Sequence, residues 1–221
     1  LPEGADAIVI QEDAGAAGIP VADAVARIGA GELEKVVLAR DLVATTEEPI
    51  DVRWPLRRLA TDYPMCWSFH VDGTFGATPE LLVRRSGAGV STVALAGSTR
   101  RSSDPAVDDH LAEQLLRSDK DRREQAIVAE RIARTLRPHA VWVEAAAEPE
   151  IVKVANIQHL ATPIVAQLAE PHSAIELAGL MHPTPAVGGE PDELAKATIA
   201  ELERMDRGWY AGPVGWMDAA E

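Results

Sequence analysis

One stretch of the sequence, residues 66–101, constrains the fold more than any other. It reads CWSFHVDGTFGATPELLVRRSGAGVSTVALAGSTRR, with an Asp-Gly pair at 72–73 and a glycine-containing turn at 86–91. An Asp-Gly pair between two β-forming runs is a strong signal for a tight hairpin, and tight hairpins join antiparallel strands. The stretch therefore predicts an antiparallel meander.

The rest of the chain alternates between blocks of helix and blocks of strand. Helical periodicity predicts helices at 20–32, 51–64, about 108–136, 173–183 and 192–208. Runs rich in β-branched residues predict strands at 4–13, followed by a polar turn, and at 33–46, 140–168 and 209–219. Blocks of this kind indicate an α+β fold rather than a doubly wound sheet, in a single domain at 1–221.

Composition excludes several classes of function. The net charge of −14 disfavours binding to nucleic acid, because an acidic surface repels phosphates. The apolar runs are too short to span a bilayer, and the first residues lack the pattern of a signal peptide. A single cysteine, Cys66, rules out an internal disulfide and a CxxC zinc cluster. We expect a cytoplasmic protein with no membrane or nucleic-acid partner.

Two titratable residues stand in apolar surroundings. Lys35 opens the run KVVLAR, where burial would lower its pKa toward that of a general base. Glu80 follows Pro79 in an apolar stretch, where burial would raise its pKa toward that of a general acid. Taken alone, a lysine that extends to water and an exposed glutamate explain these residues equally simply.

Three further groups of residues are candidates for binding. Gly97 and Ser98 could present backbone N–H groups to an anion, or could form a β-turn. Asp121 and Glu124 share a helix face and could hold Mg²⁺, although their lysine and arginine neighbours also fit a solvated face. The histidines at 159 and 182 are, in isolation, typical of structural hydrogen-bonding residues.

Seven stretches in order are more specific than any one of them. They read EKVVLAR, ATPELLVR, LAGSTRR, SDKDRREQAIV, QHLATPI, HPTPAVGGEP and RGWYAGPVGW. Together they resemble the chorismate-binding enzyme family, and the likeness covers nearly all of the chain from Val21 onward. The resemblance implies antiparallel β-sheets sandwiched between helices. HLAT followed by HPTPAVGG resembles the isochorismate synthase branch rather than the branches that use ammonia.

The resemblance implies a Mg²⁺-dependent conversion of chorismate to isochorismate, in a protein that we expect to be a monomer. Lys35 matches the base that activates water, and Glu80 matches the acid that protonates the departing hydroxyl group. Glu124 matches a metal ligand, with Asp121 near the metal. The matched substrate-binding residues are Gly97, Ser98, His159, Ala161, Gly188, Gly189, Tyr210 and Gly212.

Two departures from the family pattern qualify this interpretation. Gln125 replaces a histidine that usually ends the helix motif, so this side chain can form hydrogen bonds but cannot titrate. Family members also carry segments before Leu1 and after Glu221, including further site residues, so we expect the chain to be incomplete at both ends. The alternatives are a salicylate synthase, an aminating synthase, or a non-catalytic fragment that binds substrate or a partner.

Overall fold

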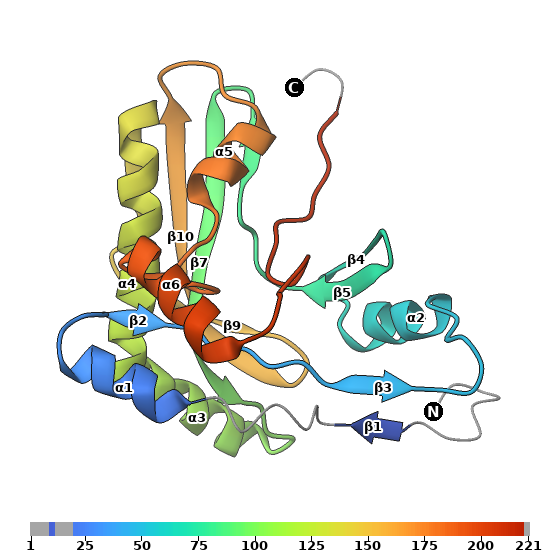
Figure 1. The fold of residues 1–221 in the computed structure, drawn as a ribbon. Helices are drawn as coiled ribbons and strands as arrows, with labels where there is room; N and C mark the ends of the chain where they lie inside the picture. The colour runs from blue at the N-terminus through green and yellow to red at the C-terminus, as the bar shows by residue number, and fades with distance from the viewer. Residues whose placement is uncertain (1–8, 12–19, 219–221) are drawn as a thin grey trace.

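The computed structural model describes residues 9–11 and 20–218. Its largest unit is an antiparallel five-stranded sheet in the order β6-β7-β10-β8, with β9 also paired to β10 (Figure 1). The strands are β6 (Arg84–Ser86), β7 (Gly89–Arg100), β8 (Ala140–Ala145), β9 (Glu150–Lys153) and β10 (Ile157–Leu168). All these pairings are antiparallel, which confirms the predicted α+β class.

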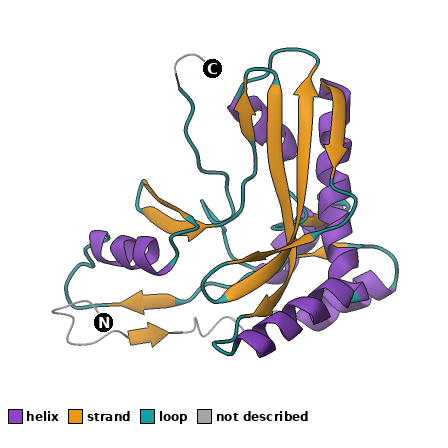
Figure 2. Ribbon diagram, turned by 180° about the vertical axis from the view of Figure 1, so that it is seen from behind, coloured by secondary structure: helices purple, strands orange, loops and turns teal. Residues whose placement is uncertain are grey.

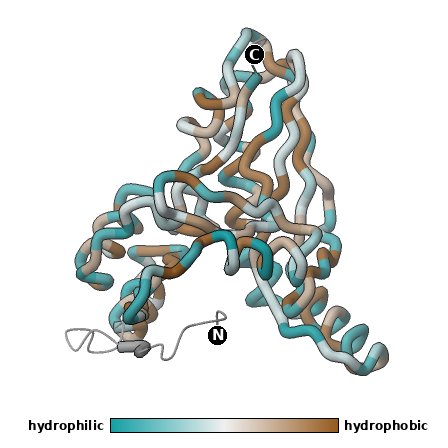
Figure 3. The backbone as a smooth tube through the Cα atoms, turned by 90° about the vertical axis from the view of Figure 1, so that its right-hand side faces the viewer, coloured by the Kyte–Doolittle hydropathy of each residue, from teal (hydrophilic) through white to brown (hydrophobic). Residues whose placement is uncertain are grey.

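Helix α4 (Asp119–Leu136) packs along β7 and β10 and forms the core with them. Much of the length of both strands is hydrophobic (Figure 3). Buried positions alternate with more exposed ones over parts of both strands, so one face of each strand lies in the core. The buried cluster comprises Val90, Ala94, Ala96, Val128, Ile132, Leu136, Ile164, Ala166, Leu168, Leu177 and Met181. Two of these come from α5 (Ala174–Met181), so α4 and α5 cover the same face, behind the strands in Figure 2.

The helix predicted at 108–136 is wrong in one respect, because the structure has two helices there. Helix α3 (Pro105–Arg117) ends just before Ser118, and α4 starts at Asp119, just after it. The Ser118 hydroxyl accepts a hydrogen bond from the Asp121 N–H at 3.3 Å, which caps the new helix. Apolar spacing continues across the break, so periodicity alone did not reveal it.

A second region consists of two-stranded sheets. β1 (Val9–Gln11) pairs with β3 (Val43–Thr45), and β4 (Trp67–Val71) pairs with β5 (Thr74–Thr78). The Asp-Gly hairpin is confirmed, because both turn residues have positive φ angles of 46° and 81°. The meander is not continuous, however, since the hairpin is separate from the five-stranded sheet.

The Lys35 strand is much shorter than predicted. β2 (Lys35–Val36) pairs with β11 (Gly189–Glu190), and α6 (Asp192–Glu203) packs against both. The predicted buried strand at 33–46 therefore contains two short strands, with residues 37–42 in neither. The side chains of residues 37–42 are half-buried or exposed, so the apolar run at 36–38 does not form a buried core strand.

Other predicted elements differ in detail. Helices α1 (Val21–Gly29) and α2 (Arg53–Asp62) are confirmed. The expected apolar side of α1, however, is exposed, at Val21, Val25 and Ile28.

A 3-10 turn, η1 (Arg137–His139), follows α4. The strand predicted at 209–219 is wrong for its described part, which forms a turn followed by irregular chain to 218. The turn predicted after β1 lies outside the described residues. No described helix has both the length and the apolar character to cross a membrane.

Candidate active site

Lys35 lies where β2 begins, and its side chain is largely withdrawn from water. Burial lowers the pKa of Lys35, while the carboxylates of Glu124 and Glu80 oppose that shift. The ammonium of Lys120 adds to the lowering. These influences come from two segments, helix α4 and the stretch after β5, so the fold gathers residues that the sequence keeps far apart.

Glu80 follows β5 on the segment that crosses to the five-stranded sheet. Its N–H donates to the Thr78 hydroxyl at 3.2 Å, which fixes the turn after Pro79. Burial raises the pKa of Glu80 to about 7, and the neighbouring Lys35 opposes the rise. A carboxyl group in this state holds its proton near neutral pH and can act as an acid.

Lys35 and Glu80 are therefore the candidate acid–base pair of this site. Each changes the pKa of the other, and burial moves the two pKa values toward each other from opposite directions. A lysine and a glutamate tuned in this way can serve as base and acid in one reaction. The predicted directions of both shifts are confirmed.

Asp121 and Glu124 lie one turn apart at the start of α4. The Lys120 ammonium is 3.0 Å from a Glu124 carboxylate oxygen and 3.9 Å from an Asp121 oxygen. The two carboxylates thus converge on one cation, and oxygen ligands with open positions suit Mg²⁺, which keeps several waters. Among the described residues, no group of three or more histidines, cysteines or acidic residues gathers as a metal site. These two carboxylates fit part of a magnesium shell.

Gly97, Ser98 and His159 meet where β7 and β10 lose register. The pairing shifts between His159 and Leu160, so Gly97 is an extra residue in β7 with a φ of +70°. A Cβ on Gly97 would lie 3.1 Å from the Asp121 Cβ, so only glycine leaves room for α4 there. The Ser98 hydroxyl and His159 Nδ1 are 2.6 Å apart, and burial lowers the pKa of His159.

Gly189 allows close contact with the Lys35 strand. A Cβ there would overlap the Lys35 carbonyl oxygen and lie 2.8 Å from the Ala195 Cβ. Gly188 is also buried, and its carbonyl oxygen accepts from the Val37 N–H at 2.7 Å. Both glycines thus hold β2, whereas their contact with substrate remains a prediction.

The structure does not connect three other predicted residues with the acid–base pair. Ala161 is fully buried in β10, opposite Leu95. Tyr210 is exposed, and the guanidinium carbon of Arg207 lies 5.8 Å from the centre of the Tyr210 ring. Gly212 closes a turn by donating to the Trp209 carbonyl oxygen at 3.0 Å. Roles for these residues in substrate binding remain predictions.

Sequence reasoning missed Lys120 and Arg207. Lys120 precedes Glu124 by one helical turn, and that spacing is a recognisable signal for an ion pair. Arg207 donates to the Val37 carbonyl oxygen at 2.9 Å and to the Val187 carbonyl oxygen at 2.8 Å. It therefore joins β2 to the loop before β11, a contact that leaves no local signal in the sequence.

Gln125, at the position where the family resemblance implies a histidine, is 2% exposed. Its side-chain N–H groups donate to the Ala94 carbonyl oxygen at 2.8 Å and the Thr162 hydroxyl at 2.9 Å. The side chain thus joins α4 to both long strands. Its side-chain oxygen is buried and has no hydrogen-bond partner among the described residues, so only the amide nitrogen of Gln125 is satisfied.

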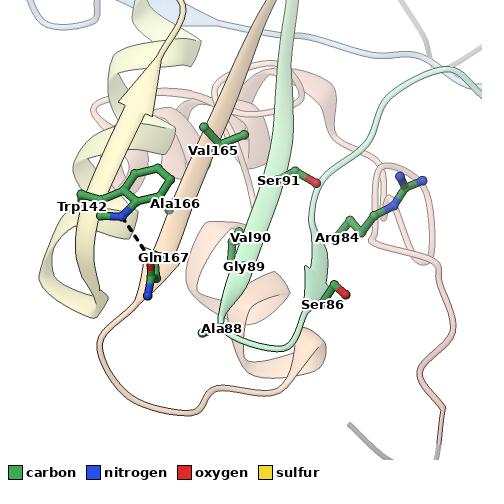
Figure 4. A pocket seen from close by; sticks show the side chains of 10 residues that line it. All are labelled: Arg84, Ser86, Ala88, Gly89, Val90, Ser91, Trp142, Val165, Ala166 and Gln167. Carbon is green, nitrogen blue, oxygen red and sulfur yellow. Dashed lines mark hydrogen bonds between the residues drawn. The ribbon is translucent and has the colours of Figure 1, made fainter.

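A separate hollow of about 510 Å³ lies on the sheet away from these residues. Figure 4 shows it between the ends of β6, β7, β8 and β10, with Trp142 donating to Gln167 at 3.2 Å. Its lining includes no residue predicted for catalysis or binding. This hollow is not part of the candidate active site.

The structure is an α+β fold in which Lys35, Glu80 and Glu124 lie near enough to act on one another electrostatically. The family described as chorismate binding enzyme matches residues 18–221. This chain belongs to that family, as its sequence motifs predicted.

Named relatives point to one branch of the family. Isochorismate synthase DhbC of Bacillus subtilis (strain 168) is 41% identical over 212 residues, covering 90% of this chain and 53% of the relative. Isochorismate synthase EntC of Escherichia coli (strain K12) is 39% identical over 204 residues, with 90% and 52% covered. The solved structure of MenF, the menaquinone-specific isochorismate synthase from Escherichia coli, matches with a TM-score of 0.83 at 28% identity, covering 93% of this chain and 49% of that one. The chain spans about half the length of the curated relatives it matches.

Proposed function

We propose that the protein containing this chain is an isochorismate synthase, which converts chorismate to isochorismate. The observation that carries the proposal is the opposed pair of pKa shifts at Lys35 and Glu80. The isomerisation needs a base and an acid at the same time, and this pair supplies both. The named isochorismate synthases among its relatives support the same reaction.

Lys35 and Glu80 divide the proton transfers between them. Neutral Lys35 accepts a proton from the water that forms a bond to ring carbon 2. Protonated Glu80 donates its proton to the hydroxyl group that leaves carbon 4 as water. One water is consumed and one is released, so substrate and product are isomers. The lowered pKa of Lys35 and the raised pKa of Glu80 favour these protonation states.

Glu124 and Asp121 would hold Mg²⁺ together with ligands that the described residues do not include. When bound, the ion supplies positive charge for the substrate carboxylate, which this acidic chain would otherwise repel. Lys120 must then release Glu124, since its ammonium occupies the same carboxylate. Ser118 keeps Asp121 oriented through a hydrogen bond from its hydroxyl group.

The acidic charge and the family's small-molecule chemistry support chorismate as the partner, with no nucleic acid or membrane involved. We further propose a monomer in the cytoplasm. The solved MenF is menaquinone-specific, whereas the proposed reaction of this protein is compatible with either quinone or siderophore synthesis.

The reaction is tested by following the products of the full-length protein. It would be incubated with chorismate and Mg²⁺, with and without an ammonium salt, and the products separated by chromatography. We expect isochorismate alone in both cases. Salicylate with pyruvate would identify a salicylate synthase, and an aminated product would identify an aminating synthase. No product from folded protein would leave only the non-catalytic interpretation.

A further inference from the structure

Glu190 is a buried acidic residue that the proposed proton transfers do not use. Its side chain is only 12% exposed, and both of its carboxylate oxygens are occupied. Arg131 donates to one oxygen and Arg134 to the other, each at 2.5 Å. A buried charge paired on both oxygens is held in one geometry, and removal of one partner leaves the other charge uncompensated.

Both arginines belong to α4, the helix whose first turns carry Asp121 and Glu124. They are three residues apart, so they project from one side of that helix. Arg131 also reaches Asp192 at 3.4 Å, at the start of α6. The Glu190 ion pairs thus join β11 to the helix that carries the proposed metal ligands.

The backbone of Glu190 holds Lys35. Glu190 lies opposite Lys35 in the β2–β11 pair, and its carbonyl oxygen accepts from the Glu34 N–H at 2.8 Å. The next bond along the pair runs from the Val37 N–H to the Gly188 carbonyl oxygen. A pair of two-residue strands has few hydrogen bonds of its own, so its position depends on what anchors β11.

We propose that Glu190 is a positioning residue, which fixes the Lys35 strand relative to α4 through Arg131 and Arg134. The inference rests on the proposed role of Lys35 as the base. The Glu190 side chain does not need to touch substrate, because Glu190 acts on Lys35 through the pairing of β2 with β11. A small displacement of a catalytic group is enough to slow a reaction strongly.

The test uses the full-length protein with Glu190→Gln, Arg131→Gln and the double variant. We expect kcat to fall about tenfold for each, with KM for chorismate changed less than about twofold, because misplacement of the base affects turnover more than binding. The double variant should lose no more than the worse single variant, as expected when two residues act through one interaction.

Hydrogen exchange gives a readout independent of activity. The amides of Glu34 and Val37 should exchange faster in Glu190→Gln, because their bonds to β11 weaken. Glu148→Gln is the matched control, since it removes an exposed 2.7 Å ion pair to Arg122 on the same helix. That control should leave kcat and both amides unchanged.

Two outcomes would overturn the inference. One is wild-type kcat and wild-type exchange at Glu34 and Val37 in Glu190→Gln. The other is a loss of kcat in Glu190→Gln that the Glu148→Gln control matches.

The Lys35→Ala variant separates failure of this inference from failure of the proposed function. If Lys35→Ala is inactive while Glu190→Gln keeps full turnover, the base role stands and the positioning role fails. If Lys35→Ala remains active, the base role itself is wrong.

Discussion

The five-stranded sheet and the strand pair that carries Lys35 are held by different forces. β7 and β10 are twelve residues long, and the apolar side chains on one face of each strand are buried in the core that they form with α4. β2 and β11 have two residues each and depend on ion pairs, backbone hydrogen bonds and the missing side chain of Gly189. Because different interactions hold the two regions, we expect mutations to damage the fold and the proposed reaction centre separately.

The largest expected effect is on turnover. Lys35→Ala and Glu80→Gln should each reduce kcat by about 10³-fold or more, because each removes a proton-transfer group. Both residues lie outside the apolar core, so the thermal unfolding midpoint should change little. Steady-state kinetics and calorimetry of the full-length protein measure both quantities. Near wild-type kcat in either variant would contradict the role assigned to that residue.

A substitution in the apolar core should lower stability without changing substrate binding. Leu136 is 1% exposed, and Leu136→Ala should lower the free energy of unfolding by about 2–5 kcal/mol through lost burial and a new cavity. KM for chorismate should stay unchanged wherever the protein is folded. Urea denaturation measures the loss. Val141→Ala, at a site 67% exposed, is the control and should change stability by less than about 0.5 kcal/mol. Equal losses in the two variants would refute the packing argument.

The smallest expected effect is the dependence of turnover on pH, which follows the protonation of Glu80. The ordinary pKa of glutamate lies well below the value of about 7 at Glu80, so this carboxyl keeps its proton until pH rises through about 7. Turnover that needs the protonated acid should therefore decline above that pH, as kcat/KM measured against pH would show.

The same pair gives a test without turnover. Lys35 opposes the raised pKa of Glu80, so Lys35→Ala should raise the pKa of Glu80 further. Carbon NMR of the labelled carboxyl group follows this change. An unchanged or lower pKa would mean that the two side chains do not act on each other.

The sequence predicted the long strands and most helices, because their signals are local, and the Asp-Gly hairpin depends on two adjacent residues. The roles of Lys35 and Glu80 followed from the ordered motifs of the family resemblance, because the residues around each of them left simpler explanations open, and these roles stay predictions. The helix break at Ser118 was missed, although a serine three residues before Asp121 is a recognisable start signal.

The contacts of Glu190 could not be predicted in the same way. Its arginine partners lie 59 and 56 residues earlier in the chain, on a helix whose direction depends on the sheet beneath it. The exposure of Val21 and Val25 was likewise not encoded locally, since apolar spacing gives the face of a helix but not what covers it. Tertiary packing determines both the ion pairs of Glu190 and the exposure of these two valines.

The pairing of β2 with β11 also bears on how the protein acquires its reaction centre during synthesis. Lys35 emerges from the ribosome before Glu190, which follows only after both long strands and α4. Contacts between distant segments form slowly, because a long loop must close first. A nascent chain can therefore build most of its sheet before the lysine strand finds its partner. We expect the reaction centre to be among the last parts of this chain to assemble.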